Sequence, residues 1–320
     1  MYTIEYNSFR IKNQIVKRFL EELEHICDEL EDKNEIAIIK KYGNEAKRFA
    51  GIIILFYCGN VAAVTSIVIL PVIPGAVVIN KSQMHHLIQN LMPVYYVNQE
   101  EYFYLLLLHM YAVMIIGGTA MVAADLMLLG YLKHACGMFR IASYRIEKAL
   151  MTNMVKKVSL KNEIIMYKEM ILAVDIHRKA IKFSEVLFDN FQGSHFFLIT
   201  VGVICLSLNL YGITKTLGDD IEQFIIHFLI VGIIWIYFFL VNYTGQEITD
   251  HYNHVFSTAY NVRWYIAPLH VQKLILFLLQ RGSKTINLQL GGIFILSLEF
   301  FATLTKASIS YFTVVYSTQQ

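Results

Sequence analysis

The sequence predicts an all-α protein that crosses a membrane five times and carries long helical loops on the cytoplasmic side. Its composition gives the first reason: 56% of the residues are hydrophobic and only 16% are charged, whereas soluble domains carry about 25% charged residues. Only four prolines and 17 glycines occur among the 320 residues, so the apolar stretches can form long helices that satisfy their own backbone hydrogen bonds in lipid. The mean hydropathy of +0.48 agrees with this class.

Residues 1–48 form a charged N-terminal region. The region contains no hydrophobic run like that of a signal peptide, so insertion is expected to depend on the first internal span. Apolar residues repeat at helical spacing, at Phe19, Leu23, Ile26 and Leu30. We therefore expect a cytoplasmic amphipathic helix here.

Residues 49–131 hold the first two spans and the loop between them. The uncharged stretch 49–70 is long enough for a hydrocarbon core that needs about 20 residues, and two prolines follow it closely. The second apolar run, 102–131, is interrupted by His109 and Asp125. Its length suits a tilted helix, and we expect Asp125 to act as a structural hydrogen-bond acceptor near the inner interface.

Residues 132–193 are polar but keep apolar residues three and four positions apart, so they predict cytoplasmic amphipathic helices rather than disorder. Residues 194–241 follow as a hairpin of two further spans. The third span is predicted at 194–213 and the fourth at 221–241.

Residues 242–289 are predicted to form a cytoplasmic anchor region with an amphipathic helix at 271–280. Residues 290–320 contain the last span, at 290–316, and a short end beyond it. The chain has no internal repeat, so the repeat symmetry found in many transporters is not supported.

The basic residues predict the orientation of the spans. The segments 1–48, 132–193 and 242–289 hold nine, eleven and four Lys and Arg residues, whereas 71–101 and 214–220 hold one each. By the positive-inside rule the first three segments are cytoplasmic. The N-terminus is then expected inside and the C-terminus outside the cell, which fits an odd number of spans.

Few features of the sequence point to catalysis or to a cofactor. No Ser/His/Asp triad, Gly-rich phosphate-binding loop or HExxH motif occurs in the structural context that it requires, so we expect that the protein is not an enzyme. The four cysteines lie far apart without a CxxC pair. His251 and His254, beside Asp250, could present two imidazoles to a metal, but no second cluster completes a site. We expect no metal or other cofactor and interpret this segment as part of the cytoplasmic assembly surface. The net charge of +2 and the absence of a basic, aromatic groove argue against a nucleic-acid partner.

The chain ends in the run SLEFFATLTKASISYFTVVYS. Four further segments precede it in order: YYVNQEEYF, DLMLLGYLKHACGMFRIASYRIE, GQEITDHYNHVFSTAYNVRWY and QKLILFLLQR. Together they resemble the insect odorant receptors from about residue 40 to the end. The resemblance implies a tuning subunit of an odorant-gated, non-selective cation channel. Such a subunit assembles with a co-receptor, as a tetramer, in the plasma membrane of olfactory neurons. The expected partners are a small volatile apolar odorant, the co-receptor subunit and membrane lipid.

The family has seven spans, and the five predicted here correspond to its S3 to S7. The first two spans of the family are therefore expected to be missing. The resemblance also implies that QKLILFLLQR and the cytoplasmic helices form the anchor between subunits.

In the family, the last span of each subunit lines the pore. Val314 occupies the position of the gate residue, and Ser317 lies one turn further out. A ring of valines can close a pore by excluding water. The alternative is that Val314 packs against a neighbouring helix.

Glu299 and Lys306 lie seven residues apart and therefore on one helix face. Each charge costs about 3 kcal/mol near the membrane centre, so neither should face lipid. Glu299 either contributes to a vestibule that favours cations or makes a structural contact with a cytoplasmic helix or another subunit.

An apolar odorant requires an enclosed pocket lined by aromatic and aliphatic side chains. The outward halves of the first, second and fourth spans supply candidates: Val61, Thr65, Tyr111, Met114 and Phe228. Each could instead be an ordinary packing residue. His109 could donate to a polar odorant or bond to a neighbouring helix.

Three other hypotheses of function remain. A gustatory-type channel usually ends with a Gln-Phe pair that this chain lacks. A G-protein-coupled receptor needs an extracellular N-terminus, which the charge distribution opposes. The third is a truncated, non-conducting receptor fragment.

Overall fold

The computed structural model describes residues 13–69, 102–154, 160–218, 221–284, 286, 289–290 and 294–318. Within these ranges the chain forms long helices, a turn of 3-10 helix and two very short strands. The helices are α2 (Asn13–Asp28), α3 (Lys33–Ile69), α5 (Phe103–Met154), α6 (Leu160–Thr216), α7 (Ile221–Asn261), α8 (Leu269–Gly282) and α9 (Leu298–Ser317). The remaining elements are η2 (Trp264–Ile266), β1 (Gln289–Leu290) and β2 (Phe294–Ile295). The all-α class is confirmed, and the loop predicted at 71–101 lies outside the described residues.

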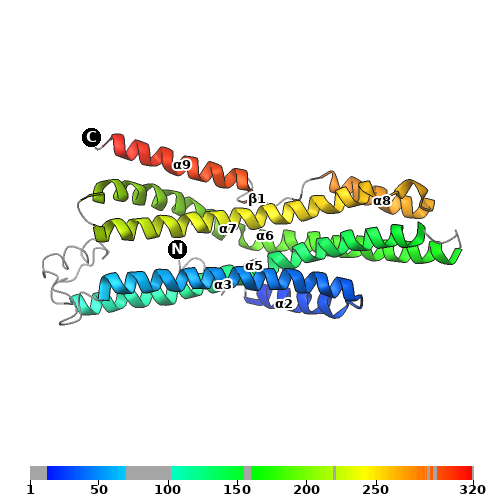
Figure 1. The fold of residues 1–320 in the computed structure, drawn as a ribbon, viewed down its shortest axis with the longest axis horizontal. Coiled ribbons are helices and arrows are strands. Elements are labelled where there is room, and N and C mark those ends of the chain that lie inside the picture. The colour runs from blue at the N-terminus through cyan, green and yellow to red at the C-terminus, as the bar shows by residue number, and fades with distance from the viewer. Residues whose placement is uncertain are drawn as a thin grey trace.

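The spans and the cytoplasmic segments form continuous helices. Figure 1 shows α3, α5, α6 and α7 running along the long axis of the molecule. α5, α6 and α7 contain 52, 57 and 41 residues, because the helical spacing of apolar residues continues past the predicted span boundaries. The helices predicted in 132–193 are therefore the end of α5 and the beginning of α6.

The last helix begins later than predicted. Leu290 pairs with Phe294 in the antiparallel β1–β2 ladder, and α9 begins only at Leu298. Ser297 is its N-cap, since the Ser297 hydroxyl oxygen accepts a hydrogen bond from the Phe300 backbone N–H at 3.1 Å. Such a cap satisfies one of the unpaired N–H groups of the first turn and so fixes where the helix starts.

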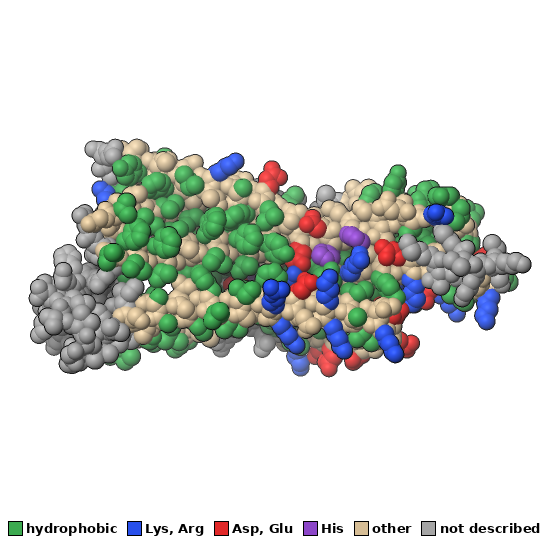
Figure 2. Space-filling view, viewed as in Figure 1, with side chains coloured by type: hydrophobic (Ala, Val, Ile, Leu, Met, Phe, Trp, Pro, Cys, Tyr) green, Lys and Arg blue, Asp and Glu red, His purple; other side chains and the backbone are tan. Residues whose placement is uncertain are grey.

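The molecule has an apolar half and a charged half, which Figure 2 shows on the left and right of the view. In the charged half, α2, α8 and the ends of the long helices enclose a core around Phe139, Ile146 and Phe183. In the apolar half, large side chains face outward, and Leu55 and Ile116 are 75% and 71% exposed. Lipid can cover such a surface at no hydrophobic cost, so the apolar half is the membrane-embedded half.

Four of the described helices, α3, α5, α6 and α7, are long and apolar enough to cross a membrane. α9 is not among them. It carries Glu299, Lys306 and six Ser or Thr residues within its 20 residues. Its role as a fifth crossing therefore stays a prediction.

A buried ion-pair network joins three of these helices where their apolar segments end. Lys133 of α5 is 3% exposed, and its Nζ lies 2.6 Å from Glu247 Oε1 of α7 and 3.4 Å from Glu45 Oε2 of α3. Burial works to lower the pKa of Lys133, but its hydrogen bonds to the two carboxylates outweigh burial and raise that pKa. More than three helical turns further along α5, Arg145 Nε donates to Glu35 Oε1 at 2.7 Å and again ties α5 to α3.

Replacing Lys133 with Met is expected to destabilise the protein strongly, because the half-buried Glu247 carboxylate would lose the cation that pairs with it. Losing one partner of a buried pair costs about 3–5 kcal/mol, and the partly exposed Glu45 places this case at the lower end. The melting temperature of the detergent-solubilised protein measures the effect. Lys17→Met removes a lysine from an exposed pair with Glu21 and should change little. An unchanged melting temperature for Lys133→Met would contradict the role given to the network.

Candidate ligand cavity and pore helix

A cavity of about 470 Å³ lies among α3, α5, α6 and α7. Its wall is mostly apolar and includes Phe56, Val64, Met121, Leu128, Phe191 and Ile233. The size and the lining are those of a site for a small organic molecule. At one end it reaches Leu132 and Thr244, which neighbour the Lys133 network, so it lies nearer the charged half than the outward pocket expected from the sequence.

The structure separates the five predicted pocket residues. Val61 and Met114 line the cavity. The hydroxyl groups of Thr65 and Tyr111 form a hydrogen bond with each other between α3 and α5. Phe228 is 60% exposed, stacks on Phe224 and is not part of the cavity wall. Whether any of them binds odorant stays a prediction.

Several polar side chains in the cavity wall donate hydrogen bonds to backbone carbonyls. Tyr57 donates its hydroxyl to the Ile115 carbonyl at 3.1 Å, and Thr244 donates to the Leu240 carbonyl at 3.0 Å. Asn60 donates from Nδ2 to the Phe56 carbonyl at 2.8 Å, while its Oδ1 accepts nothing from the described residues. These bonds use the donors of the three side chains, while Asp125, Gln192 and His195 add further polar groups to a wall that is otherwise apolar. Such a wall suits a mostly apolar ligand with a polar group.

α9 packs beside α6 and α7 through one face only (Figure 1). The buried residues of this face are Phe300, Leu304 and Ser308. The Ser207 hydroxyl of α6 donates to the Ser308 carbonyl at 3.0 Å, which fixes the distance between the two helices.

A second face of α9 is an exposed polar stripe. Its members recur every three or four positions: Glu299, Thr303, Lys306, Ser310, Thr313 and Ser317. This spacing aligns the side chains along one side of the helix. Val314 borders the stripe and is 59% exposed. All four predicted pore residues therefore lie on or beside one exposed side of α9, although their function remains a prediction.

Sequence reasoning missed the residues where the cavity meets α9. Leu296 lines the cavity and precedes the N-cap of α9. It packs against Gly245 of α7, and the Asn242 side chain of the same helix bonds to Ser297. A glycine in the middle of a helix is one local signal that another backbone approaches closely.

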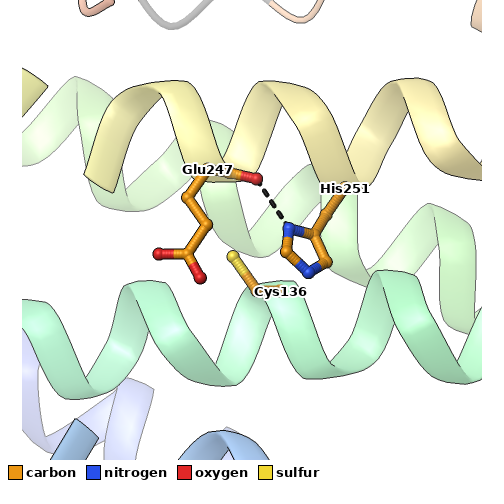
Figure 3. A group of neighbouring side chains, drawn as sticks. All are labelled: Cys136, Glu247 and His251. Atoms are coloured by element: carbon orange, nitrogen blue, oxygen red, sulfur yellow. Dashed lines mark hydrogen bonds between the residues drawn. The ribbon is translucent and has the colours of Figure 1, made fainter. Parts of the chain in front are cut away.

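Cys136, Glu247 and His251 place three possible metal-binding atoms within 4.8 Å of one another. Figure 3 shows the three side chains between α5 and α7. Both His251 and Glu247 already have partners. His251 Nδ1 lies 2.7 Å from the Glu247 carbonyl oxygen and its Nε2 lies 2.6 Å from the Tyr42 hydroxyl. The Glu247 carboxylate holds Lys133, and burial raises the pKa of the Cys136 thiol, which keeps it protonated. A metal here would have to displace these partners, so the cluster is better explained as a junction of α3, α5 and α7.

The second candidate histidine also contacts its own chain. His254 Nε2 lies 3.0 Å from Arg140 Nη1, and its Nδ1 lies 3.1 Å from Ser143 Oγ. His251 and His254 thus face α3 and α5. His254 is nevertheless exposed, so the interpretation of this segment as part of an assembly surface stays a prediction.

The comparison with known families decides the class of the protein. The family model described as 7tm Odorant receptor matches residues 6–309. The chain belongs to the 7tm odorant receptor family. Its family and fold are those of receptors rather than of known enzymes.

Solved structures of olfactory receptors share the fold of this odorant receptor. The insect olfactory receptor OR5 from Machilis hrabei in complex with eugenol matches with a TM-score of 0.76 and 16% identity, covering 99% of this chain and 79% of that one. A second structure of the OR5 receptor gives a TM-score of 0.69 and 15% identity over 98% of this chain and 78% of that one. At such identities the similarity concerns the fold alone. No curated protein sequence matches the chain significantly.

Proposed function

We propose that this odorant receptor is the tuning subunit of a ligand-gated, non-selective cation channel whose pore is lined by α9. The polar stripe of α9 carries the proposal. A helix beside the spans with six polar or charged residues along one exposed side is costly in lipid. Water in a pore shared with other subunits removes that cost, and Val314 at the border of the stripe could close such a pore by excluding water.

The cavity is the proposed odorant site. OR5 of Machilis hrabei is solved in complex with eugenol, and the volume and apolar wall of the cavity suit a small organic ligand of this kind. Ligand binding then favours the open channel to the extent that the ligand binds this state more tightly.

α8 supports assembly with a co-receptor. It lies in the charged half (Figure 1), yet large apolar side chains near and along it are exposed: Tyr265, Ile266, Leu269, Leu276 and Phe277. An apolar surface of this kind outside the membrane marks a contact with another protein. The basic residues of the charged half support an orientation in the plasma membrane with this half and the N-terminus in the cytoplasm and the C-terminus outside.

Cysteine accessibility tests the pore assignment. In cells that express the chain with an insect odorant co-receptor, Ser310→Cys is expected to let a charged, water-soluble methanethiosulfonate reagent block most of the odorant-evoked current, because Ser310 lies in the stripe. Ser308→Cys is the matched control, since Ser308 is fully buried two residues away. Equal block of the two variants, or current that depends on G proteins, would refute a pore lined by α9. Absence of current from the unsubstituted chain would favour a non-conducting fragment.

Val314→Ala is expected to raise the current without odorant several-fold. A ring of alanine side chains leaves a wider and less apolar constriction, which water enters more easily. Val315→Ala should leave the basal current unchanged, since Val315 lies seven residues after the buried Ser308 and shares its packed face. Whole-cell recording without ligand measures both. The gate lies elsewhere if the two variants behave alike.

Met114→Trp is expected to reduce the response to odorant at least tenfold, because the larger ring fills part of the cavity. Phe228→Trp adds a ring of the same kind outside the cavity and should preserve the response. The comparison uses concentration–response curves for a panel of esters, monoterpenes and eugenol, with surface expression measured in parallel. A normal Met114→Trp response would place the odorant site outside this cavity.

A further inference from the structure

We infer that Leu296 couples the odorant cavity to the pore helix, an inference that rests on the function proposed above. Leu296 is 5% exposed and belongs to the cavity wall, together with Phe238 and Val241 of α7. It is also the residue directly before Ser297, the N-cap of α9. A ligand that fills this end of the cavity therefore touches the chain one residue from the pore helix.

Leu296 is held against α7 by a close backbone approach. A Cβ atom at Gly245 would lie 2.3 Å from the Leu296 Cβ and 3.0 Å from its carbonyl oxygen. Real Cβ atoms do not come so near, so glycine at 245 permits this position of Leu296. The contact is specific to one arrangement of α7 and the start of α9.

A buried amide completes the attachment. Asn242 is fully buried, and its Oδ1 accepts a hydrogen bond from the Ser297 backbone N–H at 3.3 Å. Its Nδ2 donates to the Phe238 carbonyl at 2.9 Å, which fixes the orientation of the amide. The cap of α9 is thus bonded to the same α7 segment that forms the cavity wall.

The first turn of α9 also packs against β2. Phe294 of β2 stacks on Phe300 with ring centroids 4.7 Å apart. A shift of Leu296 would carry Ser297, the β2 ring and the first turn of α9 together. Packed contacts of this kind favour two discrete arrangements over a continuous deformation.

The coupling works through a difference in ligand contacts between those two arrangements. With Leu296 seated on Gly245, the side chain occupies one end of the cavity wall, and a shift of the pore helix changes the space available there. A ligand that fits one arrangement better favours that arrangement of α9 by its difference in affinity. The path is short, because only the N-cap residue Ser297 separates Leu296 of the cavity wall from the first residue of α9.

Leu296→Ala separates coupling from binding. In the complex with the co-receptor, the strongest agonist from the panel of esters, monoterpenes and eugenol is expected to stabilise the purified variant at concentrations within about threefold of those for the unsubstituted chain. The maximal agonist-evoked current should fall about tenfold, a size typical of coupling between sites. Leu296→Met should restore most of the current, because its volume is similar.

Two further variants identify the cause. Val64→Ala, in the cavity wall of α3, is expected to shift the effective concentration and leave the maximal current unchanged. Leu296→Ala combined with Val314→Ala should keep the ligand-independent current of Val314→Ala, which shows that the pore still assembles. A full maximal current in Leu296→Ala would overturn the coupling while leaving the proposed channel intact, and so would a loss matched by an equal loss of ligand binding. No current from any chain would instead refute the proposed channel.

Discussion

The pairing of Lys133 with Glu247 and Glu45 is the constraint on which the rest of the structure depends. An ammonium group with 3% exposure at the end of an apolar segment is tolerable only where carboxylates meet it. This requirement sets the register of α3, α5 and α7 relative to one another. Leu132 and Thr244, next to the network, already belong to the cavity wall. The position of the cavity along the bundle is therefore determined by the same contacts that hold the helices together.

The sequence predicts the helices well because their signals are local. Apolar length, helical spacing and the distribution of basic residues each act within one segment, and α8 agrees closely with the helix expected at 271–280. The predicted start of the last helix was wrong. Leu290, Phe294 and Ile295 are as apolar as the residues of a span, but they belong to the strands β1 and β2. Ser297 followed by Glu299 was a readable start signal.

The cavity was harder to predict, because its wall depends on how four helices are rotated and aligned. Val61 and Met114 line the cavity, whereas Phe228 lies in an equally apolar segment but is exposed outside it. Periodicity shows which residues share a face, but not which neighbour covers that face. Leu296 could not be found locally, since its place in the wall results from its contact with Gly245, some fifty residues away.

The polarity of α9 links gating to assembly in the proposed channel. Its packed face is satisfied by α6 and α7, while the polar stripe and Val314 have no cover within the described part of the chain. The stripe needs water, and a narrow column of water in a membrane needs several helices around it. Other subunits must then supply those helices, and the apolar side chains of α8 offer a surface to hold them. A ligand that acts at Leu296 would consequently move a helix whose other neighbours belong to partner subunits, so its effect on the pore depends on the assembly as well as on the cavity.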